Sequence, residues 1–328
     1  MQLIEFTSKG MYCPPADVYI DPHRAVNKAI VTHAHADHAR PGHKAYICTT
    51  SSLPLIKLRL GRHIQASSYD YGEKFTINGV EFTFFPAGHV VGSAQLRISC
   101  KGEVWVISGD YKRQVDGLSE AFEVVPCHCF VTESTFGLPI YKWADQETIY
   151  NEMKQWWSEN KALGKPSLVS AYSLGKAQRL IYHLAKAAIG PVYAHSTILK
   201  TNEVIQKMGF PLPEVKPIPV KWKEQEWQGA LIFSASLTSG PWAGRISPWQ
   251  RGEASGWMAL KKFRDRHGGA CFTLSDHADW NDILTTIKET GAHKVITMHG
   301  YDEPLAQWLR DHNYDASAAS FGRLPGSE

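Results

Sequence analysis

The chain has 328 residues and a formal net charge of +3, with 43% hydrophobic and 20% charged residues. This composition excludes an intrinsically disordered chain and favours a globular protein with one large or two ordinary domains. A net charge so close to zero permits a polyanionic partner but does not require one.

The termini and the cysteines favour a cytoplasmic protein with reduced thiols. Residues 1–7 lack the basic start and apolar core of a secretory signal, and no run of about 18 apolar residues could span a membrane. The six cysteines are scattered, which is not typical of a disulfide framework. Cys127 and Cys129 flank a histidine in a segment that alternates like a strand, so we expect buried thiols there and no metal site.

The densest group of candidate metal ligands lies at residues 32–40, Thr-His-Ala-His-Ala-Asp-His-Ala-Arg. The segment before it is short, apolar and β-branched, which predicts a buried strand. Extended geometry would point His33 and His35 to the same side, and a turn could bring Asp37 and His38 to a neighbouring point. Imidazole and carboxylate ligands in one loop predict two adjacent metal ions, with zinc favoured and manganese or iron as alternatives.

Other strands predicted in the first 140 residues also end at an ionisable residue. Asn78-Gly79 lies between two alternating segments, which predicts a hairpin. Strand ends of this kind form a site along one rim of a sheet. The strands predicted at 18–20, 80–85, 103–108 and 129–132 lead to Asp21, His89, Asp110 and Glu133, respectively.

From about residue 146 the pattern changes to alternating helices and strands. A helix at 146–163, a strand at 166–170 and a helix at 179–188 are predicted. A helix N-terminus that follows a strand can hold an anion, so the turn between them offers candidate phosphate contacts. An ordinary strand-to-helix turn explains the same residues equally well. These candidates are Ser173, Lys176 and Gln178.

The last 60 residues resume the first pattern. A strand at 270–274 leads to His277, a helix is predicted at 280–290, and a strand at 294–298 leads to His299. The site begun in the first 140 residues is therefore completed here, and the middle segment is an insertion. The basic run in that insertion could line a strand-binding groove, although a solvated helix face is the commoner use. It comprises Lys261, Lys262, Arg264 and Arg266.

Residues 32–38, together with Gly88-His89, Gly109-Asp110 and His299-Gly300, resemble the signature of the metallo-β-lactamase fold. Three further elements resemble the extra motifs of its β-CASP nuclease branch, and residues 173–178 are similar to a motif of the β-CASP cap. These elements are Glu133, residues 275–279 and His299. Residues 253–258 and 274–280 look most like the bacterial exonucleases associated with DNA ligase, which are related to Artemis and the DNA cross-link repair nucleases.

The resemblance implies an α/β fold, a metallo-β-lactamase αββα sandwich with an inserted β-CASP cap. The core would comprise residues 1–145 and 265–328, and the cap residues 146–264. Two zinc ions are implied, with manganese as an alternative. Asp21 would support the ligands by hydrogen bonding, and Asp17 is the less favoured residue for that role. The implied ligands are His33, His35 and His89 for one ion, Asp37, His38 and His299 for the other, and Asp110 as the bridge.

The same resemblance implies a zinc-dependent nuclease, a 5′→3′ exonuclease on single-stranded DNA or DNA ends in DNA repair. Two metal ions about 3.5–4 Å apart can activate a water and hold a phosphodiester, and Asp37 and Asp110 would contribute to that chemistry. His277 would protonate the leaving oxygen, with Glu133 holding it in the charged form. A functional link to an ATP-dependent DNA ligase and a helicase is also implied. Arg40 and Arg113 lie beside ligands and are candidate phosphate contacts.

Three alternatives remain open at this stage. An RNA-processing β-CASP nuclease, cutting internally or from the 5′ end, would share every catalytic motif. A small-molecule hydrolase such as a thioesterase would share the metal ligands but would not need Glu133, His277 or a cap. A non-catalytic binding module is disfavoured because a ligand is intact at every expected metal position.

Overall fold

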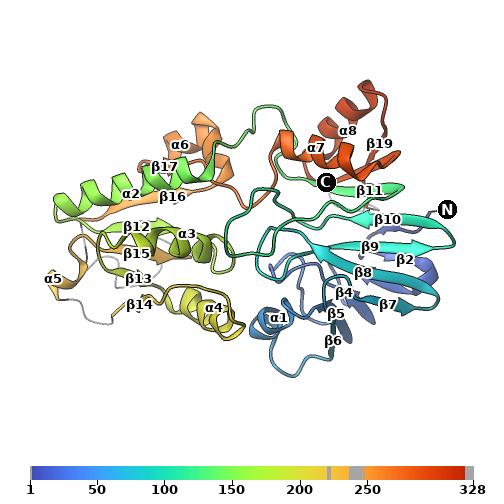
Figure 1. Cartoon of the computed structure of the whole chain (residues 1–328), viewed down its shortest axis with the longest axis horizontal. Helices are drawn as coiled ribbons and strands as arrows, with labels where there is room; N and C mark the ends of the chain where they lie inside the picture. Colours follow the sequence, from blue (N-terminus) through green and yellow to red (C-terminus); the bar gives the residue numbers. More distant parts are fainter. Residues whose placement is uncertain (1, 220–222, 236–245, 247, 322–328) are drawn as a thin grey trace. The chain divides into compact units, whose positions relative to one another are not determined.

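The computed structural model describes residues 2–219, 223–235, 246 and 248–321. The chain forms two compact units, the first of residues 1–141 and 277–328 and the second of residues 142–276 (Figure 1). The bounds predicted for the cap, 146–264, fall inside the second unit. No helix in the described part of the chain is long and apolar enough to cross a membrane.

The first unit contains two sheets. The first has the order β1-β2-β3-β4-β5-β6 and the second the order β19-β18-β11-β10-β9-β8-β7. The strands of the first sheet are β1 (Glu5–Thr7), β2 (Gly10–Cys13), β3 (Val18–Ile20), β4 (Lys28–Ile30), β5 (Ala45–Thr49) and β6 (Ala66–Tyr69). Those of the second are β7 (Lys74–Ile77), β8 (Val80–Pro86), β9 (Ala94–Cys100), β10 (Glu103–Ile107), β11 (Cys129–Ser134), β18 (Lys294–Gly300) and β19 (Asp315–Ala318).

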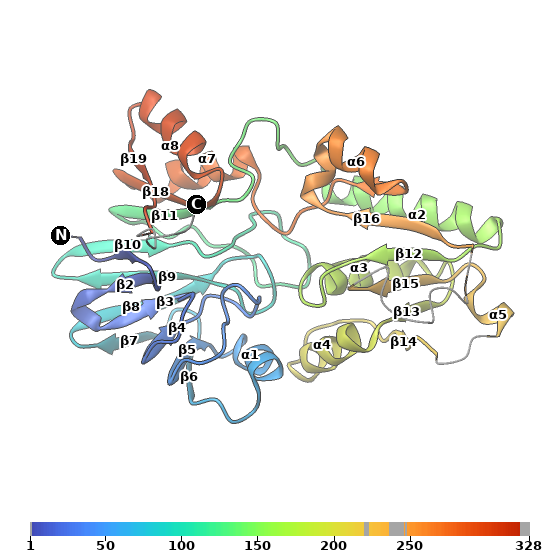
Figure 2. The ribbon, with the colours of Figure 1, turned by 180° about the vertical axis from the view of Figure 1, so that it is seen from behind.

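Successive side chains of a strand point to opposite faces of its sheet, and this alternation builds the layers of the first unit. On β10, Trp105 and Ile107 belong to the apolar cluster shared by the two sheets, whereas Val106 belongs to a cluster on the opposite face. Helices α7 (Trp280–Thr290) and α8 (Asp302–Asp311) cover that opposite face (Figures 1 and 2). Each large apolar side chain buried in these layers contributes about 1.5–3 kcal/mol. The predicted α/β class is confirmed.

Local signals in the sequence located several elements of the first unit correctly. Asn78 and Gly79 have φ of 49° and 79°, and the hairpin closes with Ile77 opposite Val80. This left-handed pair matches the right-handed twist of the strands that it joins. The helix predicted at 280–290 coincides with α7, and a further helix, α1 (Leu53–Leu60), lies between β5 and β6. Cys127 and Cys129 are buried free thiols, as expected.

Parallel pairing brings candidate site residues to one edge of the second sheet. Strand β10 pairs in parallel with β11, and β11 pairs in parallel with β18, so their carboxyl ends meet at the same edge. Asp110 follows β10, Glu133 is the second-last residue of β11, and His299 is the second-last residue of β18. Strands β11 and β18 therefore run two residues further than predicted, and they include Glu133 and His299.

The second unit is an open sheet of six parallel strands with the order β14-β13-β15-β12-β16-β17. It has a core of its own, centred on Leu168, Ile232 and Ile246. The strands are β12 (Ser167–Ser170), β13 (Val192–Ala194), β14 (Lys216–Pro217), β15 (Leu231–Ser234), β16 (Gln250–Ala254) and β17 (Ala270–Phe272). The helices are α2 (Gln146–Ala162), α3 (Lys176–Leu184), α4 (Ser196–Lys207), α5 (Glu224–Trp227) and α6 (Lys261–His267).

Helix α3 begins at Lys176, three residues earlier than predicted. Gly175 precedes it with φ of 92°, and its N–H donates to Oε1 of Gln178 at 2.8 Å. This side-chain bond replaces a backbone acceptor at the helix start, so the first turn forms directly after the glycine. Lys176 and Gln178 consequently lie within the helix and not in the turn before it.

Candidate metal and catalytic site

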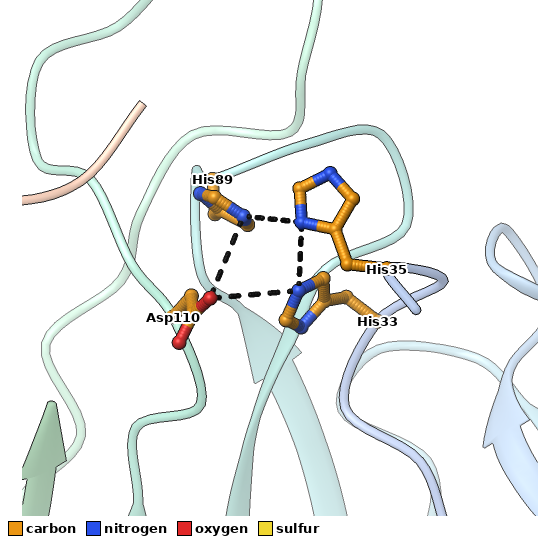
Figure 3. Close-up of side chains that lie close together, drawn as sticks. All are labelled: His33, His35, His89 and Asp110. Carbon is orange, nitrogen blue, oxygen red and sulfur yellow. Dashed lines mark hydrogen bonds and ion pairs between the residues drawn. The ribbon is translucent and has the colours of Figure 1, made fainter. Parts of the chain in front are cut away.

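Four side chains of the first unit converge on one point (Figure 3). Nε2 of His33 and Nε2 of His89 each lie 3.1 Å from Nδ1 of His35. Oδ2 of Asp110 lies 3.6 Å from Nε2 of His33 and 3.8 Å from Nε2 of His89. Tetrahedral zinc with bonds of about 2.0–2.1 Å places its ligand atoms about 3.3 Å apart. The three nitrogens and the carboxylate oxygen therefore fit an ion of this size.

Loops at strand ends position these ligands. His33 and His35 follow β4, and His89 follows β8 in a loop that needs glycine. Gly88 has φ of 74°, and a Cβ there would lie 2.2 Å from the carbonyl oxygen of Lys112. The loop can thus approach the segment after Asp110 closely enough to bring His89 into the cluster.

Asp21 holds the buried His38 from behind. Its Oδ2 lies 2.8 Å from Nδ1 of His38, and it also accepts from Oγ1 and N of Thr32 at 2.7 and 2.9 Å. This leaves Nε2 of His38 directed at Asp110, 3.5 Å from Oδ2. A carboxylate on the far nitrogen is the usual support of a metal-ligating imidazole. Asp17 is exposed and accepts from the hydroxyl of Tyr12, away from the ligands.

The remaining predicted ligands surround the same region more loosely. Oδ2 of Asp37 lies 3.7 Å from Nε2 of His38, with its side chain 66% exposed. The ring of His299 lies 5.4 Å from that of His38. His299 and Asp21 both have left-handed backbones, with φ of 59° and 42°. Asp110 lies between the three-histidine cluster and His38, because its Oδ2 is within 3.8 Å of ring nitrogens of both. A second ion at His38 is a proposal.

His277 and Glu133 form a hydrogen-bonded pair beside Asp110. Nδ1 of His277 lies 2.8 Å from Oε2 of Glu133, and the other carboxylate oxygen accepts from N of Tyr111 at 2.6 Å. Glu133 is buried, whereas the side chain of His277 is 23% exposed. Ligand atoms of Asp110, Glu133 and His277 lie within 4.8 Å of one another and form a second group that could hold a metal.

Burial and neighbouring charges shift the pKa values of the cluster. Burial lowers the pKa of His33 well below its usual value, and His38 lowers it further. Burial also disfavours the charged form of His38, but the carboxylates of Asp110 and Asp21 outweigh it and raise the pKa of His38 well above the usual value. Burial opposes ionisation of Asp110, yet His38 holds its pKa well below the usual value. Asp110 thus stays in the ionised form that a cation requires.

Lys176, a candidate phosphate contact, is buried within the second unit. Its Nζ donates to the carbonyl oxygen of Leu274 at 2.7 Å and lies 3.1 Å from Oδ2 of Asp276. Arg179 lies 2.9 Å from the other oxygen of Asp276 and donates to the carbonyl oxygen of Ser275 at 2.7 Å. Burial lowers the pKa of Lys176 to about 8. Lys176 would have to leave these partners to reach a phosphate, so its contact stays a prediction.

The other candidate phosphate contacts also have partners inside the protein. Nε2 of Gln178 donates to the carbonyl oxygen of Ser173 and to Oδ1 of Asn202, at 3.0 and 2.8 Å. Arg113 pairs with Glu289 at 2.7 Å, so its guanidinium is held against α7. The basic run predicted at 261–266 lies on α6, where its charged side chains are exposed.

Sequence reasoning missed His23, which lies next to the cluster. Burial lowers the pKa of His23, and the nearby Arg40 and His299 lower it further. Arg40 is half-buried and donates from Nε to the carbonyl oxygen of Asp37 at 3.2 Å. The available signal was the position of His23, two residues after Asp21 at the same strand end.

Comparison with known proteins found several relatives, although no family model matches the chain. The chain is 27% identical over 320 residues to a probable DNA ligase of Opitutus terrae, covering 95% of this chain and 30% of that protein. It is 29% identical over 332 residues to endoribonuclease YSH1 of Gibberella zeae, covering 94% and 38%. An RNase J-like protein of Methanocaldococcus jannaschii is 23% identical over 210 residues, covering 55% and 50%. The chain thus spans half or less of each relative.

These relatives agree with the motifs that the sequence carries. They fit a β-CASP nuclease of the metallo-β-lactamase superfamily, the family that these motifs resemble. The similarity to the DNA ligase and to the endoribonuclease extends over nearly all of this chain, so it includes both the first unit and the inserted second unit. The predicted β-CASP resemblance is therefore confirmed, and the His/Asp cluster is a candidate metal site of this family.

Proposed function

We propose that this chain is a metal-dependent nuclease that hydrolyses phosphodiester bonds in single-stranded DNA or at DNA ends, from the 5′ end. The observation that carries the proposal is the position of Asp110, which belongs both to the three-histidine cluster and to the group with Glu133 and His277. A nuclease needs a cation site for the phosphoryl group and a proton donor beside it. Asp110 belongs to the proposed cation site and also lies beside the proposed proton donor.

We assign two ions to the site, with zinc favoured and manganese as the alternative. Ions bound there would supply Lewis-acid activation of water and would stabilise negative charge at the phosphoryl group. Asp21 fixes the tautomer of His38 by accepting a hydrogen bond from Nδ1. The lone pair of Nε2 is then free to bind a metal ion. The proposed ligands are His33, His35, His89 and Asp110 for one ion, and Asp37, His38, His299 and Asp110 for the other.

His277 is the proposed proton donor. Glu133 is held on both oxygens, by N of Tyr111 and by Nδ1 of His277, so it cannot rotate away without losing a bond. A carboxylate on Nδ1 orients the imidazole and favours its protonated form, which leaves Nε2 to protonate the departing sugar oxygen.

The choice of DNA is supported by the similarity to a protein named probable DNA ligase. We further propose work in DNA repair in the cytoplasm, linked functionally to an ATP-dependent DNA ligase and a helicase, as the resemblance of residues 253–258 and 274–280 to ligase-associated exonucleases implies. The second candidate is RNA processing, supported by relatives named endoribonuclease and RNase J-like protein. A thioesterase-like hydrolase has less support, because it has no need of the Glu133–His277 pair.

The test is cleavage of end-labelled single strands by the purified protein. DNA and RNA labelled at either end are incubated with zinc or manganese, and the products are separated by length. We expect DNA to be shortened progressively from its 5′ end. RNA cleaved faster than DNA would favour the second candidate, and no cleavage of either strand would reject the nuclease proposal.

Two variants test the assigned residues. Asp110→Ala should abolish cleavage and lower the bound metal, since it removes a ligand shared by both ions. His277→Ala should slow cleavage by a factor of about 10²–10⁴ while leaving bound metal unchanged, because it removes only the proton donor. Loss of metal in His277→Ala would instead indicate that His277 binds a metal ion in the group with Asp110 and Glu133.

A further inference from the structure

The first unit has a basic pocket of about 340 Å³ outside the metal cluster. Three lysines and one carboxylate line it, so its lining carries two more positive than negative charges at neutral pH. All four of these side chains are exposed to solvent. The lining includes Lys9, Lys28, Lys44, Asp17, Tyr19 and Asn27.

Backbone hydrogen bonds fix the three lysines relative to one another. Lys9 lies in the turn between β1 and β2, Lys28 begins β4, and Lys44 immediately precedes β5. N of Lys44 donates to the carbonyl oxygen of Val26 at 3.0 Å, which ties the two lysine-bearing loops together. The segments that carry Lys28 and Lys44 are therefore joined through the backbone, and the lysine side chains themselves are in solvent.

Two chain segments run from the pocket toward the His/Asp cluster. N of His23 donates to the carbonyl oxygen of Lys9 at 2.8 Å, and His23 lies close enough to Arg40 and His299 for their charges to act on it. Gly42, which also lines the pocket, follows Arg40 by two residues. Lys9 is thus joined through the backbone to His23, and Gly42 through the chain to Arg40, and both His23 and Arg40 lie toward the cluster.

An aromatic surface accompanies the charges. Tyr19 lines the pocket, and its ring lies 4.6 Å from that of Tyr12 at an angle of 33°. Single-stranded nucleic acids bind to grooves that combine positive charge for the phosphates with aromatic rings for the bases. Three lysines beside a tyrosine match this requirement better than they match the requirement of a small compact anion.

We propose that this pocket is a second binding site for single-stranded nucleic acid, which holds the backbone of the strand beyond the bond cut at the metal cluster. The inference rests on the proposed function in that the strand held there is the substrate. Lysines 9, 28 and 44 contact phosphates, and Tyr19 stacks against a base. DNA and RNA share this backbone chemistry, so both are tested.

The experiment measures strand binding, independently of cleavage. The zinc-loaded full chain is titrated into labelled oligothymidine or oligouridine with a phosphorothioate backbone that resists hydrolysis, over a range of salt concentrations. Each phosphate contact adds about 0.7 to the slope of log affinity against log salt. Lys44→Glu and Lys28→Glu should each weaken binding about fivefold near 0.1 M salt and reduce that slope by about 0.7.

Two further variants separate the pocket from general charge. Lys288→Glu reverses an equally exposed charge on α7 and should leave affinity and slope unchanged. Asp17→Asn removes the carboxylate of the pocket and should strengthen binding about twofold. Zinc content and melting temperature are measured for every variant to show that it is folded.

The inference is overturned if Lys44→Glu and Lys28→Glu bind like the unaltered chain, or if Lys288→Glu weakens binding as much as they do. Weaker binding by folded Asp17→Asn would also contradict it. Strand binding that depends on the pocket without any cleavage would leave this inference standing and reject the nuclease proposal. Cleavage with a pocket that makes no contribution to binding would reject this inference alone.

Discussion

At the scale of single residues, Asp21 shows how a buried carboxylate can act on the candidate metal site without belonging to it. It accepts three hydrogen bonds, two from Thr32 and one from His38, and so fixes the His38 ring. We expect Asp21→Asn to weaken metal binding about 10- to 100-fold, since the amide cannot hold the same tautomer as strongly. Competition with a chromophoric zinc chelator measures the affinity.

Asp17→Asn is the matched control for that measurement. Asp17 has the same side chain and also a left-handed backbone, with φ of 51°, but it accepts from Tyr12 at the surface. Its replacement should leave metal affinity unchanged. Equal losses in both variants would show that the effect of Asp21→Asn does not come from His38.

Asp282, near the start of α7, provides a pH-dependent test of stability. Burial and the neighbouring Asp279 carboxylate raise the pKa of Asp282 to about 6. The folded state therefore binds this proton more tightly than the unfolded state, whose carboxyl has a pKa of about 3.9. The penalty for ionisation is absent below about pH 4, grows as the pH rises, and is complete above about pH 6.

We expect Asp282→Asn to raise the free energy of unfolding by about 1 kcal/mol at pH 7, because solvent screens part of the penalty at this half-buried site. The gain should disappear near pH 4. Urea unfolding at several pH values between these limits measures it. A variant no more stable than the parent at pH 7 would contradict the raised pKa.

At the scale of elements, a buried ion pair ties the start of α3 to residues 274–276. Lys176 and Arg179 share Asp276, and all three side chains are almost completely buried. Asp276→Asn would leave two buried cations without their counter-charge, so we expect the second unit to lose about 3–5 kcal/mol of stability. Chemical unfolding followed by tryptophan fluorescence would measure the loss.

Lys176→Met is the comparison for that prediction. It removes one cation but leaves Asp276 paired with Arg179, and burial already lowers the pKa of Lys176. The methionine variant should therefore be destabilised less than Asp276→Asn. The reverse order would show that the lysine and not the carboxylate dominates the stability of this pair.

Elements and candidate ligands were predictable from the sequence wherever the signal was local. The candidate ligands from His33 to His38 lie within six positions, and the Asn78-Gly79 turn specified its hairpin. The start of α3 was misplaced because its first turn is stabilised by a side-chain bond to Gly175 and not by apolar periodicity. Boundaries set by such bonds leave little trace in a pattern of hydrophobic residues.

Contacts between distant segments were harder to predict. The Glu133–His277 pair spans 144 positions and was expected from the resemblance to a family, not from spacing. The partners of Lys176 lie about 100 positions away, and the sequence suggested a phosphate contact instead. A buried lysine and an exposed lysine look alike in sequence, because burial is decided by the tertiary fold.

At the scale of the whole molecule, the proposed ligands come from both segments of the first unit and none comes from the second. Metal binding to the folded state should therefore stabilise the first unit selectively. We expect a strong chelator to lower the melting temperature of one calorimetric transition and to leave the other unchanged. In Asp110→Ala the chelator should have little effect on either transition. A shift of both transitions in the unaltered chain would contradict this expectation, because it would show that metal binding also stabilises the second unit.

The left-handed backbones of Asp21 and His299 have a consequence for the history of this protein. A non-glycine residue in that conformation costs of order 1–3 kcal/mol, and at these two positions the side chains are the support of His38 and a proposed metal ligand. A copy of the gene released from selection for catalysis could gain stability by placing glycine at either position. Among related sequences, glycine at position 21 or 299 should therefore mark pseudoenzymes, even where the more conspicuous histidine loop is still intact.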